Sequence, residues 1–543
     1  MLVDAHAKWM TDFSEYWTDA VQRSVLFTDI LRKRGNLYLE HLNNGQPPVL
    51  VFDYEMIMDG RTLAQPVNYA LVRILDRRCE AAADQGGMTK DQRHRTRIAV
   101  EAPEATSRPI VIFDPRAGHG PGIGGSKRDS QIGMALDAGH PVYFLIFFTH
   151  PMPGQTLADV RNAQIKFLEK VRECHPRAPK PAVIGNCQGG WAAALVGAER
   201  PDLVGPRGFN GSPLSDWGGV EGVNPRRYLG GLMGGVWINS LLSDIGNGTF
   251  DGAHLVANFE NLNPANTLWA KNYHVYANVD KEESRFLDFE KWWGGFFLMT
   301  DREIHQIVEG LFVGNKLERG EFELEEGRRV DLKSNDNPVV VFASFGDNIT
   351  PPQQAFNWIV KTYGTVEEIK RRGQVIVCIG HSKIGHLGIF VSAKIARKEH
   401  KEIIASFDML TYLPPGLYEM RIEEDPDQAG EYAVKYIEKN MDDILALDDG
   451  IEDEKAFLAV RQVSETADLF YRNMVSPWIR QANNDFFADT LRQLHPMRMQ
   501  RYMLSDLNPG MVPVKKAAAI IKSGRRRKPV AESNPFRACL LYT

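Results

Sequence analysis

One cysteine stands in a context that could activate its thiol for nucleophilic chemistry. Apolar residues at 182–184 lead into Gly185-Asn186-Cys187-Gln188-Gly189, and an alanine-rich stretch follows over 190–196. A strand, a glycine-flanked turn and a helix in this order form a nucleophile elbow, which lifts the nucleophile above the end of a sheet. The positive end of the helix dipole also favours a thiolate there. We therefore predict that Cys187 is a nucleophile, against the alternative of an inert buried cysteine.

A nucleophilic cysteine needs a base, and the base needs a group that orients it. Asp347, His381 and His386 each come shortly after an apolar run rich in β-branched residues. The carboxyl ends of parallel strands lie at one edge of a sheet, so these side chains are expected to converge on Cys187, in the chain order that α/β hydrolases use. We favour His386 as the base, because its loop of small residues can reach back over the elbow. We interpret His381 as a structural loop histidine.

The glycine-rich stretch Gly118–Gly125 follows another predicted strand and allows two interpretations. It matches the G-x-G-x-x-G pattern of dinucleotide sites, but the next predicted strand ends without an acidic residue, and Pro121 lacks an amide donor. We favour an oxyanion hole, in which backbone amides near His119 and Gly120 and the amide of Gln188 bind the tetrahedral oxygen. No cofactor is expected on this interpretation.

Composition excludes several classes of protein. The chain has 543 residues and a net charge of −5, which argues against nucleic acid as a partner. Its five cysteines contain no CxxC pair, so we expect neither a disulfide framework nor a zinc site. The first residues carry acidic side chains and no apolar core typical of a secretory signal, and no apolar run approaches the roughly 20 residues of a membrane span. We expect a cytoplasmic protein.

Alternating strands and helices predict an α/β fold with a mostly parallel sheet covered by helices on both faces. The periodicity over residues 8–42 predicts an amphipathic aromatic helix, broken near Gly35, that packs on its own protein or on a lipid or polymer surface. Changes in composition divide the chain into parts: a helical N-terminal extension (1–107), a catalytic core (108–412), a Gly- and Trp-rich cap inserted in the core (217–332), a helical C-terminal region (413–510) and a basic, disordered tail (511–543).

Residues 108–392 resemble the polyhydroxyalkanoate synthases. The resemblance rests on Gly185–Gly190, which is similar to the Gly-x-Cys-x-Gly-Gly box of that family, and on Asn315–Gly320, Gly346–Pro351 and Gly385-His386. It implies an α/β-hydrolase fold, a cysteine nucleophile at Cys187 with an aspartate at 347 and a histidine at 386, and polymerisation of 3-hydroxyacyl-coenzyme A thioesters. The chain departs from the family at Asn186, where an aromatic residue is common, and at Trp292–Phe296. It resembles most a divergent bacterial branch of uncertain function.

These observations predict a cysteine-nucleophile acyltransferase of the synthase type that acts on (hydroxy)acyl-coenzyme A thioesters. An ester or thioester hydrolase, or a polymer depolymerase, would use the same three residues with water as the acceptor. A third interpretation is a catalytically idle relative that binds polymer granules or membranes through its terminal helices. The expected partners are an acyl thioester or ester, a granule or membrane surface and a second copy of the chain in a homodimer.

Overall fold

The computed structural model describes residues 2–76, 106–424, 431–523 and 526–540. In these ranges one sheet has the strand order β1-β2-β4-β3-β5-β6-β11-β12-β13-β14. Its central strands pair in parallel, whereas β1, β2 and β14 pair antiparallel with their inner neighbours. The strands are β1 (Tyr54–Asp59), β2 (Tyr69–Ile74), β3 (Ile110–Phe113), β4 (Val142–Phe147), β5 (Ala182–Asn186), β6 (Arg207–Asn210), β11 (Val339–Ser344), β12 (Val375–His381), β13 (Gly416–Glu424) and β14 (Tyr432–Glu438).

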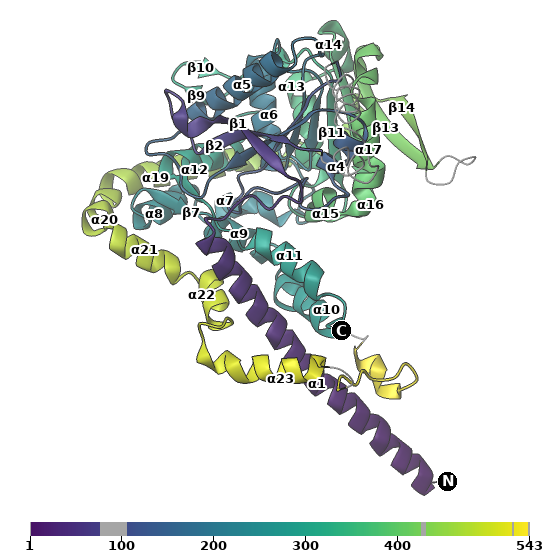
Figure 1. Ribbon diagram of the computed structural model, residues 1–543. Coiled ribbons are helices and arrows are strands. Elements are labelled where there is room, and N and C mark those ends of the chain that lie inside the picture. The colour runs from purple at the N-terminus through teal and green to yellow at the C-terminus, as the bar shows by residue number, and fades with distance from the viewer. Residues whose placement is uncertain (1, 77–105, 425–430, 524–525, 541–543) are drawn as a thin grey trace, which may run out of the picture.

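Helices cover both faces of this sheet, as Figure 1 shows. Alternate residues of β3 belong to different cores: Val111 and Phe113 pack with α5 (Leu157–Cys174), α6 (Gln188–Glu199) and α13 (Pro352–Tyr363). Ile110 and Ile112 pack on the other face with α4 (Gln131–Asp137), α15 (His386–Val391) and α17 (Lys401–Ser406). A strand buried on both faces carries an unbroken apolar run, which explains the sequence pattern. The chain has an α/β-hydrolase fold, which confirms the predicted fold class.

A helical insertion joins β6 to β11 and lies over the carboxyl ends of the central strands. Within it, a two-stranded antiparallel sheet of β7 (Thr249–Asp251) and β8 (Leu298–Thr300) closes the segment that contains α9 to α11. Its helices are α7 (Leu229–Leu232), α8 (Trp237–Ile245), α9 (Ala253–Asn261), α10 (Lys271–Ala277), α11 (Glu283–Trp293) and α12 (Asp301–Ile307). We call this insertion the cap.

The first helix, α1 (Leu2–Asn43), is continuous, and its N-terminal half projects away from the α/β body (Figure 1). The predicted break at Gly35 does not occur. This glycine instead permits a close approach to a second helix, because a Cβ there would overlap the carbonyl oxygen of Leu504. The buried residues Leu26 and Ile30 of α1 pack with Phe286 of α11 and with Ala518 near the C-terminus.

The structure corrects the predicted boundaries at both ends of the core. The sheet includes β1 and β2 from the region predicted to be a helical extension (1–107), and β13 and β14 from the predicted C-terminal helical region (413–510). Their place in the sheet is decided by pairing of β2 with β4 and of β13 with β12, contacts between segments far apart in the chain that strand propensity alone does not specify.

The described part of the predicted disordered tail (511–543) is ordered. Its helix α23 (Val512–Lys522) packs on α1, and Arg527 forms ion pairs with Asp19 and Asp280. The preceding C-terminal helices are α19 (Ala456–Met474), α20 (Ser476–Ala482), α21 (Asp485–Gln493) and α22 (Pro496–Met503). Among the helices described, none combines the length and apolar character that crossing a bilayer requires.

Candidate functional site

Cys187 lies at the sharp turn between β5 and α6, where its backbone adopts φ 49° and ψ −120°. A non-glycine residue at positive φ is strained. The turn is held by close backbone packing at the glycines on either side of Cys187. A Cβ on Gly185 would lie 2.5 Å from Cα of Gly190, and a Cβ on Gly189 would overlap the carbonyl oxygen of Phe113. The glycines of this segment therefore let β5, α6 and β3 approach one another, and Cys187 itself is 5% exposed.

A hydrogen-bonded line runs from a carboxylate through an imidazole to the sulfur of this cysteine. His386, the first residue of α15, places Nε2 3.2 Å from Sγ of Cys187 and Nδ1 2.6 Å from Oδ2 of Asp347. Oδ1 of Asp347 accepts the backbone N–H groups of Ile349 and Thr350, each at 2.8 Å, which orients the carboxylate. The structure thus brings together the three side chains that the sequence singled out.

The competing histidine has a different place. Nδ1 of His381 accepts the backbone N–H groups of Lys383, at 3.2 Å, and Ile384, at 3.1 Å. Its carbonyl oxygen accepts the N–H of Phe345 at 2.9 Å. His381 therefore holds the turn that carries His386 to the cysteine, and it is His386 that contacts Cys187.

The electrostatics of the line favour a charged imidazole. Burial lowers the pKa of His386, but the Asp347 carboxylate and Cys187 outweigh burial and raise this pKa to about 10. An imidazolium beside a thiolate is the resting form that activated cysteine nucleophiles use. The fully buried pair of His386 and Asp347 can therefore hold a positive charge next to Sγ.

This charge predicts how stability depends on pH. The pKa of His386 is about 10 in the folded protein against a reference of 6.5, so its protonated form stabilises the fold fully below pH 6.5. The stabilisation is lost as pH rises through about 10. We expect the difference in free energy of unfolding between wild type and His386→Gln to shrink by a few kcal/mol over this interval in urea titrations. A difference that stays constant with pH would contradict a charged His386.

The glycine loop 118–125 lies beside the cysteine. Asp114, a residue that the sequence did not point to, holds the loop in place. The carboxylate of Asp114 accepts the N–H groups of Gly122 at 2.6 Å and Ile123 at 3.1 Å. The amides that a pyrophosphate would need are therefore occupied, which disfavours the dinucleotide interpretation. Asp114 directly follows β3, and a strand-end position of this kind is a signal that could have identified it.

The residues predicted to form an oxyanion hole lie at this loop and at the start of α6. The His119 ring is buried and packs at a tilt against Trp292, with ring centroids 4.2 Å apart, and burial lowers its pKa to about 4. Trp292 donates its indole N–H to the carbonyl oxygen of Gly120 at 3.0 Å. The backbone N–H of Gln188 is the first of α6 and has no acceptor within the helix. Nothing in the sequence pointed to the contact with Trp292.

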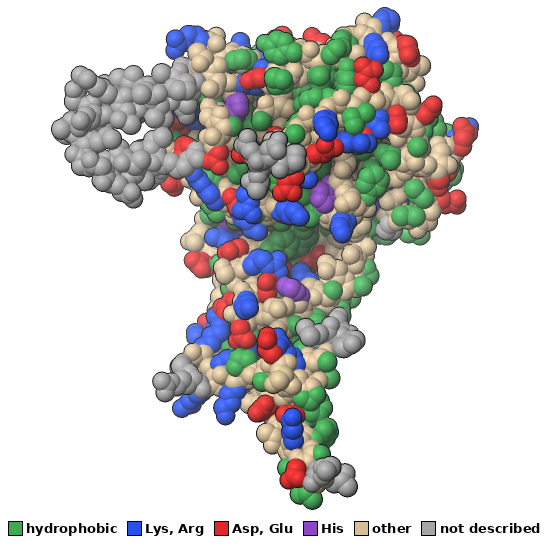
Figure 2. Space-filling model, turned by 90° about the vertical axis from the view of Figure 1, so that its right-hand side faces the viewer, with side chains coloured by type: hydrophobic (Ala, Val, Ile, Leu, Met, Phe, Trp, Pro, Cys, Tyr) green, Lys and Arg blue, Asp and Glu red, His purple; other side chains and the backbone are tan. Residues whose placement is uncertain are grey.

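A cavity of about 500 Å³ opens beside the elbow and extends under the cap. Gln188 lines it near the cysteine, Trp217, Phe250 and Phe312 line it from the cap region, and Phe457 of α19 lines it at another side. Its volume and mostly apolar wall suit an organic acyl group. Figure 2 shows hydrophobic side chains in a recess where the wide body meets the narrower lower part of the molecule.

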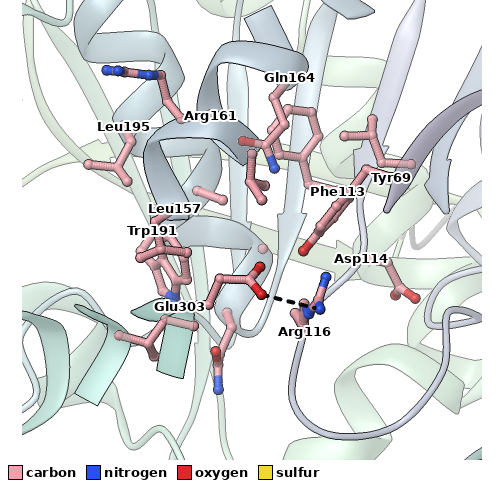
Figure 3. Close-up of a pocket in the computed structure, with 16 residues that line it drawn as sticks. Tyr69, Phe113, Asp114, Arg116, Leu157, Arg161, Gln164, Trp191, Leu195 and Glu303 are labelled. Atoms are coloured by element: carbon pink, nitrogen blue, oxygen red, sulfur yellow. Dashed lines mark ion pairs between the residues drawn. The ribbon is translucent and has the colours of Figure 1, made fainter. Parts of the chain in front are cut away.

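A second, much smaller cavity of about 30 Å³ lies between α5 and α6 (Figure 3). Its polar wall includes Asp114, Arg116 and Glu303, and Arg116 pairs with Glu303 at 3.5 Å. This volume holds one or two water molecules and no substrate. Within the described residues no group of three His, Cys, Asp or Glu side chains is arranged to hold a metal ion.

Comparison with known proteins places the chain in a family. The sequence profile described as "Protein of unknown function (DUF3141)" matches residues 19–540. The chain belongs to the DUF3141 family. The chain is also 46% identical over 538 residues to the "Uncharacterized protein in ackA 5'region" of Rhizobium meliloti. The match covers 97% of the chain and 70% of that relative.

More distant relatives of the DUF3141 chain carry functional descriptions. It is 26% identical over 255 residues to the "Poly(3-hydroxyalkanoate) polymerase subunit PhaC" of Haloarcula marismortui, covering 44% of the chain and 50% of that protein. The subunit of the same description from Thiocystis violacea is 27% identical over 280 residues, 50% of the chain and 72% of the relative. A Paleococcus ferrophilus monoacylglycerol lipase structure aligns at 14% identity and TM-score 0.34, over 56% of the chain and 96% of the lipase.

Proposed function

We propose that this protein is a cysteine-dependent acyltransferase that takes acyl groups from thioesters, with (hydroxy)acyl-coenzyme A as the substrate class. The observation that carries the proposal is the line from Asp347 through His386 to Sγ of Cys187. The similarity to polymerase subunits supports the substrate class. A thiol suits this chemistry, because moving an acyl group from one thioester to another is nearly balanced in free energy, and the enzyme-bound thioester stays reactive.

The proposed reaction has two halves. In the first, Sγ of Cys187 attacks the carbonyl carbon of the thioester, and His386 holds the thiol proton. The N–H of Gln188 and amides of the loop at His119 and Gly120 stabilise the oxyanion. The bond to the substrate sulfur then breaks, and His386 returns its proton to the leaving thiolate. In the second half, a hydroxyl acceptor gives its proton to His386 and attacks the acyl group, which forms an ester and frees Cys187.

Water could replace the hydroxyl acceptor, which would make the protein a thioester or ester hydrolase with the same residues. The exposed aromatic residues Trp9, Phe13 and Trp17 of α1 support a second part of the proposal, association with an apolar granule or membrane surface in the cytoplasm. They would equally serve contact with a second copy of the chain. These partners are separate from the acyl chemistry and are tested separately, by flotation with vesicles and by sedimentation.

Mass spectrometry of the intact protein tests the acyl chemistry. After brief exposure to octanoyl-coenzyme A or 3-hydroxybutyryl-coenzyme A, we expect a mass increase of one acyl group that hydroxylamine removes. Because Cys174 and Cys539 are exposed, peptide mapping must place the acyl group on Cys187. The Cys187→Ala variant should remain unlabelled, whereas Cys174→Ala should label as wild type does.

The fate of the acyl group separates the alternatives. Transfer to an added hydroxyacyl acceptor faster than release into buffer supports the acyltransferase. Release into buffer at a rate that acceptors do not change identifies a hydrolase. If no thioester in the panel acylates Cys187, the proposal of acyl chemistry is wrong, and the interpretation as an idle relative replaces it.

A further inference from the structure

The cavity under the cap has an apolar wall interrupted by two neighbouring arginines. Arg226 and Arg227 belong to the short helix Pro225–Tyr228 at the start of the cap, and both line the cavity. The same wall contains one carboxylate, that of Asp216. Each arginine is paired with one carboxylate, Arg226 with Asp216 in the wall and Arg227 with Asp453 outside it. Charged groups are rare in apolar ligand pockets unless they orient a ligand.

Arg226 keeps hydrogen-bonding capacity that the protein does not use. Its Nη2 donates both to Asp216 and to Oε1 of Gln354, the latter at 3.1 Å. Its guanidinium carbon lies 5.1 Å from the centroid of the Phe312 ring. Within the described residues Nε is buried without a partner, and neither hydrogen bond uses Nη1. The side chain is therefore held in place by one nitrogen, while the other two still have N–H groups to donate.

Arg227 follows Arg226 in the chain and also lines the cavity. Its Nη2 pairs with Asp453, and its guanidinium lies 4.9 Å from the ring centroid of Phe457 and 5.4 Å from that of Tyr228. Nε and Nη1 are buried and have no partner among the described residues. Buried N–H groups of a charged side chain are almost always satisfied in folded proteins. Each of the two arginines thus has buried N–H groups without an acceptor among the described residues.

We propose that the cavity binds an acyl chain that carries a carboxylate at its far end, and that Arg226 binds this carboxylate. This inference rests on the proposed function for the reacting end of the chain, which would lie at Gln188 and Cys187. The apolar wall would contact the methylene groups between the two ends. A carboxylate supplies two acceptor oxygens in the planar geometry that a guanidinium matches.

The local carboxylate can adjust to such a ligand. Burial raises the pKa of Asp216 to about 6, although Arg226 acts in the opposite direction. Asp216 is therefore a carboxylate that takes up a proton readily when a second anion arrives beside Arg226. His254, the other titratable side chain of the wall, has its pKa lowered by burial and adds no positive charge at neutral pH.

Direct binding to the Cys187→Ala protein tests the inference without any catalysis. The two probes are methyl octanoate and monomethyl suberate, which share an ester end and chain length but finish in a methyl group and a carboxylate. By isothermal titration we expect monomethyl suberate to bind about 10- to 100-fold more tightly. Arg226→Lys, which keeps a charge beside Asp216 but loses the planar fork, should reduce this preference to about twofold while methyl octanoate binds unchanged.

Matched variants and the possible outcomes keep the test decisive. Arg285→Met removes an exposed arginine of α11 away from the cavity and should leave the preference intact. Equal binding of both probes, or a preference that survives Arg226→Lys, would overturn the inference. Because the titration needs no acylation, a failure of the inference leaves labelling of Cys187 unaffected. If Cys187 is not acylated, the titration still shows whether the cavity prefers the carboxylate.

Discussion

Replacing His386 with alanine should slow acylation of Cys187 by about 10⁴-fold, whereas His381→Ala should leave the rate within about a factor of ten. His386 contacts both the sulfur and Asp347, so its loss removes the base and the charge that stabilises a thiolate. The ring of His381 accepts two backbone N–H groups of the turn that carries His386. The measurement is the release of free coenzyme A from an acyl-coenzyme A substrate, followed with a thiol reagent under single-turnover conditions.

The pair of histidine variants separates a chemical role from a structural one. Both should fold, and circular dichroism and thermal unfolding provide the control. Asp347→Asn should give an intermediate loss of about 10²- to 10⁴-fold, because the amide no longer stabilises the imidazolium. If His386→Ala stayed active while His381→Ala lost activity, the assignment of His386 as the base would be wrong.

Gly185→Ala should destabilise the protein more than any other single methyl group added to the sheet, by about 3 kcal/mol or more. The added Cβ would meet three backbone atoms of α6, among them Cα of Gly190 at 2.5 Å and the carbonyl carbon of Gly189 at 2.6 Å. Backbone atoms at the start of a buried helix cannot yield as the tip of a side chain can. We expect a lower midpoint in urea unfolding and loss of Cys187 acylation together, because the same contact sets the elbow.

Gly208→Ala in β6 is the matched control. It adds a methyl group to the neighbouring strand of the same sheet, where the nearest atoms are the ring of Phe407 at 3.6 Å and the side chain of Ile184 at 3.8 Å. These are ordinary van der Waals distances, so the change in stability should stay below about 1 kcal/mol. Comparable losses in the two variants would show that the sheet in general, and not the elbow, rejects the methyl group.

Regions beyond the part that resembles the synthases contribute directly to the site. The C-terminal helix α19 closes one side of the cavity with Phe457 and Val460. Trp292, at a position where the chain departs from the synthases, packs at a tilt against His119 and donates its indole N–H to the carbonyl oxygen of Gly120. Phe296, four residues further on, lies under the guanidinium groups of Arg498 and Arg501 from α22. Trp292 therefore contacts the glycine loop, and α19 closes the cavity.

The sequence alone was sufficient for the elements that depend on local pattern. An apolar run followed by Gly-x-Cys-x-Gly-Gly predicts a strand, a tight turn and a helix, because only small residues allow the close approach seen at Gly185 and Gly189. The positions of Asp347 and His386 after two further apolar runs predicted their meeting with Cys187, because parallel strands end at one edge. These inferences need only short-range periodicity and one rule of topology.

The tertiary structure decided what depends on contacts between distant segments. His386 rather than His381 reaches Cys187 because two backbone amides hold the His381 ring in the turn. The edge strands, the packing of α23 on α1, the role of Asp114 in the glycine loop and the closing of the cavity by α19 each join residues far apart in the chain. Local sequence carries no record of such pairings, because each is selected by burial and hydrogen bonding in the folded whole.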